Sequence, residues 1–229
     1  MGIVATAVGV DGCGTGWIAV VLRPGEPAQA HYLARIDELT AAVPDAAVVG
    51  IDMPIGLPES GRRQADVLAR VALGPRRSSI FFAPVRAALA AATHATGTAA
   101  SVRLTGAGMS RQSYALAGKI FEVEQWLPQA PCPVHEVHPE LSFATLLGAP
   151  AGAGKKSWAG MIQRREILGR HDIRLDHVTG PAARYAATDD MLDAGAAAWT
   201  AARLLAGRAE SLPDPPEIDR DGRLMAIWF

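Results

Sequence analysis

Two apolar runs in the sequence each end in an aspartate, and this pattern limits the folds open to the chain. The runs are IVATAVGVD (residues 3–11) and AAVVGID (residues 46–52). Runs of this length that are rich in β-branched residues predict buried strands. In open α/β sheets, ligand sites lie at the carboxyl ends of the strands. We therefore expect Asp11 and Asp52 to lie close together at one edge of a sheet.

The order of the other segments predicts an α/β protein with a mixed sheet. Glycines after Asp11 lead into GWIAVVLRPG, which indicates a hairpin, and AQAHYLARI predicts a third short strand. Residues from about 60 to 130 are mostly helical in pattern, and CPVHEVHPELSFATLL contains a fifth strand. A polar helix, an amphipathic helix with Thr188 as its cap, and a turn with a last strand follow. We expect one domain over residues 1–229, with a helical insertion at roughly 60–130.

Composition excludes several classes of protein. The 229 residues carry a net charge of −1, with 49% hydrophobic and 20% charged residues, which is ordinary for a soluble globular protein. The two cysteines, Cys13 and Cys132, lie far apart and favour a reducing compartment. The N-terminal MGIVATAVGV lacks a basic leader and indicates a strand, and no apolar run approaches the ~20 residues of a membrane span. We expect a cytoplasmic protein with no membrane partner.

Acidic residues recur at positions where they can cooperate. Asp190 and Asp193 are three residues apart and share one face of the last amphipathic helix. Two carboxylates at ~4 Å repel each other by about 4 kcal/mol at an effective dielectric constant near 20, so a cluster of them needs a cation. Hard oxygen ligands without cysteine favour Mg²⁺ or Mn²⁺ over zinc. We predict metal ligation by Asp11, Asp52, Asp190 and Asp193, in a site suited to phosphodiester hydrolysis.

A second acidic stretch, PVHEVHPELSF, follows the helical insertion. Strand alternation places Glu136, His138 and Glu140 on one face, with His135 on the other. Glu136 is a candidate further ligand or general base, and His138 a candidate for proton transfer. Structural hydrogen bonding is the competing interpretation for the histidines, and it is the one favoured for His135.

A set of ordered motifs resembles one known family. The motifs are GVDGCGTGWIAV, IDMPIGLP, RRSSIFFAPVRAAL, GMSRQSYALAGKIFEVE, HEVHPELSFATL, DDMLDAGAAAWTA and the terminal RLMAIWF. Together they resemble the domain-of-unknown-function 429 family, whose members are predicted to be nucleases of RNase H-like fold. The resemblance implies a five-stranded mixed sheet with an antiparallel second strand and a closing helix that bears the last acidic ligands.

The chain is similar, more distantly, to the Holliday-junction resolvases. Those enzymes place one acid on the first strand, one at the fourth strand and two on the final helix, which implies the catalytic set Asp11, Asp52, Asp190 and Asp193. The resolvases usually have glutamate at the fourth strand, so Asp52 has a shorter reach. Nucleic acid, DNA or RNA, is the implied substrate.

A basic segment fits such a substrate. Between Gly61 and Arg86, six arginines accompany a single aspartate, a local charge of +5. The residues predicted to contact substrate phosphates are Arg76, Arg77, Arg86, Arg111 and Lys119. The intervening Ile80, Phe81 and Phe82 are better interpreted as core or subunit interface, which allows a homodimer, than as a platform for base stacking.

Three functions compete on these grounds. A metal-dependent nuclease or phosphodiesterase is the leading hypothesis. An ATPase or kinase is the second hypothesis, because DGCGTGW resembles the phosphate loop of actin-like and sugar-kinase proteins. Those proteins duplicate the fold, whereas this chain carries one copy of it. The chain also has no G-x-x-x-x-G-K-[ST] motif. The third is a non-catalytic RNase H-like binding module.

Overall fold

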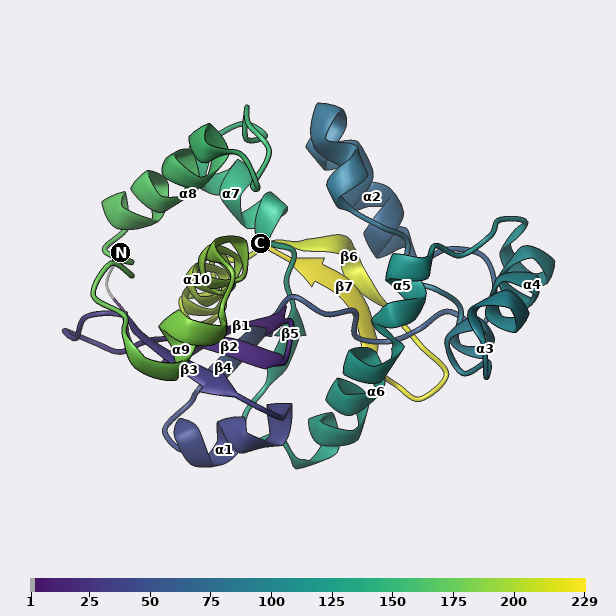
Figure 1. Ribbon diagram of the computed structural model, residues 1–229, viewed down its shortest axis with the longest axis horizontal. Coiled ribbons are helices and arrows are strands. Elements are labelled where there is room, and N and C mark those ends of the chain that lie inside the picture. Colours follow the sequence, from purple (N-terminus) through teal and green to yellow (C-terminus); the bar gives the residue numbers. More distant parts are fainter. Residues whose placement is uncertain (1–2) are drawn as a thin grey trace.

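Five strands form one mixed sheet in the computed structural model, which describes residues 3–229 (Figure 1). Their order is β3-β2-β1-β4-β5; β2 is antiparallel to both of its neighbours, while β4 is parallel to both β1 and β5. The strands are β1 (Ala7–Cys13), β2 (Gly16–Leu22), β3 (Gln29–Leu33), β4 (Val48–Ile51) and β5 (Val134–Glu136). The predicted α/β class, with a mixed five-stranded sheet, is confirmed.

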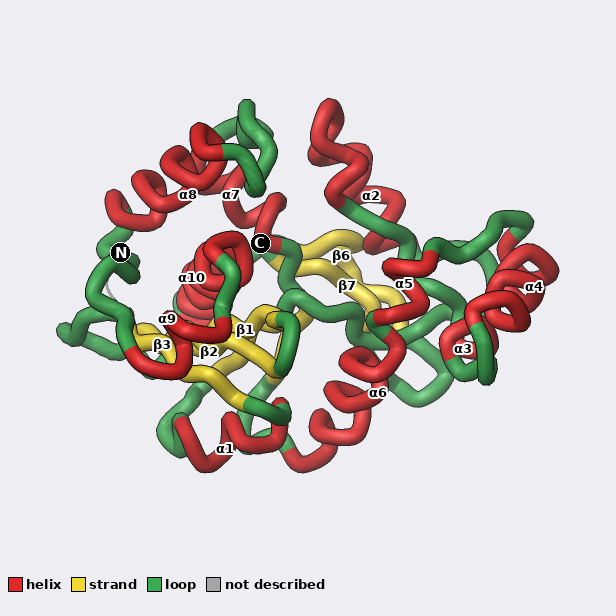
Figure 2. The backbone as a smooth tube through the Cα atoms, viewed as in Figure 1, coloured by secondary structure: helices red, strands yellow, loops and turns green. Residues whose placement is uncertain are grey.

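Helices cover both faces of this sheet and fill the segment between β4 and β5, as predicted. Before β4 lie η1 (Ile36–Glu38) and α1 (Leu39–Ala42). The insertion contains α2 (Gln64–Leu73), η2 (Gly74–Ser79), α3 (Arg86–Leu89), α4 (His94–Thr105), α5 (Arg111–Ala115), α6 (Ala117–Trp126) and η3 (Leu127–Gln129). After β5 come α7 (Pro139–Leu147), α8 (Trp158–Arg170), α9 (Gly180–Tyr185) and α10 (Thr188–Leu205). Figures 1 and 2 show α10 on one side of the sheet and α1 and α6 on the other.

Strand alternation separates two hydrophobic cores. Val8 and Val10 of β1 point to the face that packs against α1 and α6. Ala7 and Cys13 point to the opposite face, where they pack with α10. Asp11 lies an even number of residues from Ala7 and from Cys13 along the strand, so its side chain lies on the same face, the α10 side of the sheet.

Two glycines let α10 approach the sheet closely. A Cβ on Gly9 would lie 1.9 Å from the backbone nitrogen of Ala198 and 2.2 Å from the carbonyl oxygen of Ala194. A Cβ on Gly50 would lie 2.9 Å from the carbonyl oxygen of Ala197. Only glycine in the strands, facing alanine in the helix, allows this spacing. The contact fixes the position of α10 relative to the ends of β1 and β4.

The chain ends in a separate hairpin of β6 (Ser211–Ile218) and β7 (Leu224–Trp228). The predicted turn and last strand are present, and Gly222 has the positive φ of 82° that such a turn requires. The sequence did not predict β6, because prolines cannot donate to a strand ladder. The structure accommodates them with an irregular stretch between Leu212 and Glu217, where the register shifts.

Two local predictions were wrong by small margins. Thr188 is the first residue of α10 and not its cap; the cap position is Ala187, whose backbone N–H donates to the Asp190 carboxylate at 3.1 Å. The first strand begins at Ala7, four residues later than the apolar run, and it continues to Cys13 because Asp11 still pairs with Ile18 of β2. The first two residues of the N-terminal run lie outside the described residues. Within residues 3–229, no helix combines the length and apolarity needed to cross a bilayer.

Candidate metal centre

Parallel pairing of β1 with β4 brings Asp11 and Asp52 together. Gly9 lies opposite Gly50 in the ladder, and each aspartate follows its glycine by two residues. The backbone N–H of Asp52 donates to the carbonyl of Val10 at 2.8 Å, which continues the pairing beyond the end of β4. Because side chains two residues apart in a strand share a face, both carboxylates lie on the side occupied by α10.

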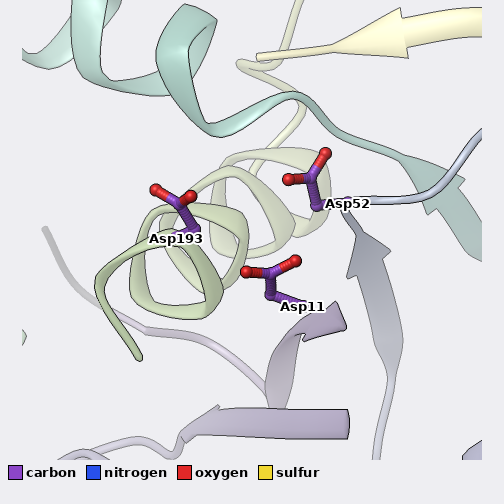
Figure 3. A group of neighbouring side chains, drawn as sticks. All are labelled: Asp11, Asp52 and Asp193. Atoms are coloured by element: carbon purple, nitrogen blue, oxygen red, sulfur yellow. The ribbon is translucent and has the colours of Figure 1, made fainter. Parts of the chain in front are cut away.

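The helix α10 supplies a third carboxylate, from Asp193. Carboxylate oxygens of Asp11, Asp52 and Asp193 all lie within 4.8 Å of one another (Figure 3). Asp193 is only 2% exposed, and within the described part of the chain its Oδ1 has no hydrogen-bond partner. Buried polar atoms are nearly always paired, so an orphaned carboxylate oxygen beside two more carboxylates fits a bound cation. The three residues could hold one divalent metal ion.

Burial raises the pKa of each of these carboxyl groups, because desolvation penalises the charged form. The pKa of Asp52 is raised to about 7 and that of Asp193 to about 6. The pKa of Asp11 is raised well above its usual range, first by burial and then by the charges of Asp52 and Asp193. A cation at this position would favour the ionised forms of all three.

Lys155 provides a positive charge beside this group. Its Nζ donates to Oδ2 of Asp193 at 2.5 Å and lies 3.8 Å from the carboxylate of Asp189. Burial alone would lower the pKa of Lys155, but the negative charge of Asp193 outweighs it and raises the pKa above its ordinary value. The residue lies between α7 and α8, in a loop that contains Gly152 and Gly154. The ammonium group therefore lies where it would compete with a bound metal ion for Asp193.

The three carboxylates line a cleft of about 600 Å³ between the carboxyl edge of the sheet and the helical insertion. Of the predicted phosphate-binding residues, Arg76 and Lys119 line this cleft. Lys119 is held by its Nζ, which donates to the Gly16 carbonyl at 2.5 Å and lies 4.2 Å from the centre of the Trp17 ring. Further polar side chains on the walls are Ser78, Ser79, Gln112 and His138.

Two of the predicted catalytic acids have other partners. Glu136 is buried and forms a two-pronged ion pair with Arg63, with N–O distances of 2.7 and 2.8 Å. The same arginine binds Asp66 at 2.6 Å. Asp190 accepts the N–H of Ala187 at the start of α10. The structure thus brings together three of the five predicted acids.

The other predicted phosphate contacts lie away from the cleft walls. Arg77 and Arg111 are exposed, and neither is among the residues that line the cleft within the described range. Arg86 pairs with Glu124 at 2.6 Å and lies 3.9 Å from Asp219, so the C-terminal hairpin helps to neutralise it. Formal charge along the sequence therefore overstates the charge available to a ligand.

A family described as a protein of unknown function (DUF429) matches residues 9–218, a range that contains all three carboxylates of the cluster. The chain belongs to the DUF429 family. Searches of curated proteins and of solved structures gave no significant match.

Two residues that shape the cleft, Lys155 and Arg164, were not predicted from the sequence. No motif around Lys155, apart from the neighbouring glycines, indicated a role in the site. Arg164 of α8 is fully buried and binds both carboxylate oxygens of Glu140, at 2.7 and 2.8 Å. Glu140 also accepts from Arg76 at 3.3 Å, so it holds that arginine at the cleft wall. The pairing joins α7 and α8, and only the tertiary fold brings these residues together.

Proposed function

We propose that this protein is a metal-dependent nuclease or phosphodiesterase that hydrolyses phosphodiester bonds of nucleic acid. One observation carries the proposal: three carboxylates, two buried and one partly buried, converge in an open cleft whose walls also carry cationic side chains. The resemblance of the sequence motifs to a family of predicted RNase H-like nucleases supports the same conclusion. Carboxylates without cysteine or histidine neighbours in the group favour Mg²⁺ or Mn²⁺.

Asp11, Asp52 and Asp193 would hold the ion. A bound divalent ion supplies an activated water and neutralises charge on the leaving oxygen in phosphodiester hydrolysis. The three ligands come from β1, the segment after β4, and α10, all part of the packed core, so their positions are set in advance. Asp190 and Glu136 are proposed to act from outside this group: Asp190 on the start of α10, and Glu136 on the segment after β4, where it accepts the N–H of Ile55.

Cationic side chains of the cleft would bind the phosphates that flank the reacting group. Lys119 and Arg76 are each held by a neighbour, at the Trp17 ring and at Glu140, so little side-chain entropy is lost when a phosphate binds. Lys155 would exchange its partner Asp193 for a substrate phosphate when a metal takes the carboxylate. The hydroxyl of Ser78 can donate to the same oxygens, whereas that of Ser79 already donates to the carbonyl of Arg76 at 2.7 Å.

Cleavage assays test the proposal. The purified protein, with Mg²⁺ or Mn²⁺, is incubated with branched DNA, an RNA/DNA hybrid and single strands, and the products are resolved on denaturing gels. At least one substrate should be cut, and Asp11→Asn and Asp193→Asn should each abolish the cut. Asp214→Asn, an exposed aspartate of β6, is the matched control and should cleave at the parent rate.

Two results would overturn the proposal. One is a panel on which no substrate is cleaved with either metal. The other is cleavage that survives both cluster substitutions, because the activity would then come from another site or a contaminant.

A further inference from the structure

A second cavity, which we call the insertion pocket, adjoins the cleft of the metal centre. It has a volume of about 310 Å³, and its walls include Arg62, Phe81, Phe82, Val85, Met109 and Ser113. Phe81 lines both the insertion pocket and the cleft. The helix α5 also separates them, since it contributes Gln112 to the cleft and Ser113 to the pocket. A ligand that lies in the cleft therefore has a second compartment immediately beside it.

An aromatic ring stacked with guanidinium groups forms one wall of this pocket. The guanidinium carbon of Arg62 lies 3.9 Å from the centre of the Phe82 ring, and that of Arg70 lies 4.9 Å from it. Ile80 is buried, as expected for a core residue, whereas Phe81 and Phe82 are only partly buried. The two phenylalanines therefore keep ring surface for a ligand.

Arg62 is the cation that a ligand in the insertion pocket would meet. Arg63, its neighbour in sequence, is buried in ion pairs with Glu136 and Asp66. Arg70 is tied to the backbone, because it donates to the carbonyl of Ile80. Arg62 is exposed, and stacking on a ring leaves the N–H groups at its edge available to hydrogen-bond acceptors.

We propose that the insertion pocket accepts one nucleobase of a single-stranded nucleic acid whose phosphodiester lies in the cleft. The assignment rests on the proposed function and adds a base-binding subsite to it. Bases stack on aromatic side chains and on arginine planes, and they offer acceptors to a guanidinium edge. An acyl chain would leave the N–H groups of Arg62 without acceptors, and an isolated phosphate would not use the rings of Phe81 and Phe82. A flat heterocycle uses both features.

Abasic scanning tests the base-binding subsite. A fluorescein-labelled single strand of about 12 nucleotides, a length within the range that single-strand-binding domains cover, is made with a single abasic residue at each position in turn. Fluorescence anisotropy with Mg²⁺ measures its affinity for the Asp11→Asn protein, which retains the pocket but should not cut the strand. One position, or two adjacent ones, should weaken binding by about 5- to 150-fold when abasic, the range for loss of one stacked base.

Substitutions in the pocket should remove this positional effect. In the same background, Arg62→Gln and Phe82→Leu should bind intact and abasic strands with equal affinity. Arg103→Gln, an exposed arginine of α4 outside the pocket, should retain the positional difference. Because Arg62 is exposed, its substitution tests the pocket even if Phe82→Leu destabilises the fold.

The outcomes separate this proposal from the proposed function. If the parent protein cleaves nucleic acid but no abasic position weakens binding, the base-binding subsite is refuted and the nuclease function stands. If nothing is cleaved but one position is sensitive and Arg62→Gln abolishes the effect, the subsite stands without the reaction. A complete lack of oligonucleotide binding overturns the subsite, whatever the cleavage assay gives.

Discussion

Neutralising one acid of the carboxylate cluster should stabilise the protein in a chelator and destabilise it in the presence of a divalent metal ion. In Asp11→Asn the shape of the side chain is kept, and the amide oxygen can still accept the N–H of Gly12, which Oδ1 accepts at 2.7 Å. The substitution removes one of three carboxylates whose oxygens lie within 4.8 Å of one another. The change therefore acts mainly on charge.

The size of the effect follows from Coulomb's law. Two full charges 4.8 Å apart repel by roughly 3.5 kcal/mol at an effective dielectric constant near 20. Asp11 faces two such carboxylates, but near pH 7 both Asp52 and Asp193 hold protons part of the time, the raised pKa of Asp11 lowers its own mean charge, and Lys155 attracts Asp11. We expect a net gain of about 2 kcal/mol in the free energy of unfolding, or about 4–8 °C in Tm for a chain of this size.

A bound metal ion should reverse the order of the two melting temperatures, so that the parent protein melts at a higher temperature than Asp11→Asn. An ion at a hundredfold excess over its Kd stabilises the folded state by about 2.7 kcal/mol, and Asp11→Asn should lose most of this gain. Differential scanning fluorimetry in EDTA and in Mg²⁺ or Mn²⁺ measures both effects, with Asp214→Asn as the matched control. A lower Tm for Asp11→Asn in EDTA would refute the repulsion argument, and equal metal shifts in both proteins would refute the metal site.

Three other predictions concern the same region. Lys155→Met should lower the metal concentration needed for half-maximal thermal stabilisation by about tenfold, because no ammonium then competes for Asp193. The control Lys156→Met should leave this concentration unchanged. Equal half-maximal metal concentrations for Lys155→Met and the parent would contradict the competition. In EDTA, Tm should fall as the pH rises from about 4 through about 7, because burial raises the pKa of Asp52 from 3.8 to about 7 and the folded state favours the protonated form. Asp52→Asn should flatten this dependence of Tm on pH. A parent Tm that rises over this pH range would contradict the prediction. Gly9→Ala should lower the free energy of unfolding by at least about 3 kcal/mol, because the alanine Cβ would meet the backbone of α10. Chemical denaturation measures this loss. A midpoint close to that of the parent would show that α10 can shift and would contradict the prediction.

The strands and their acids follow from local patterns in the sequence. Apolar runs rich in β-branched residues favour buried strands, and period-two alternation then decides which side chains share a face. Asp11 and Asp52 were predictable for this reason. Their convergence needs only parallel pairing of two strands that each carry an aspartate two residues after a glycine. Asp193 was predictable from its helix, because a polar residue precedes a closely packed alanine face.

Only the tertiary structure decided which charged residues the site contains. Glu136 and Arg63 are far apart in sequence but pair in the interior, because a buried carboxylate is stable there only with a buried cation. Arg86 is drawn to Glu124 and the C-terminal hairpin for the same reason. Lys155 reaches Asp193 through a loop that no periodic pattern positions. Strand and helix patterns act over a few residues, whereas charge pairing depends on which distant segments the packed core brings within a few ångströms.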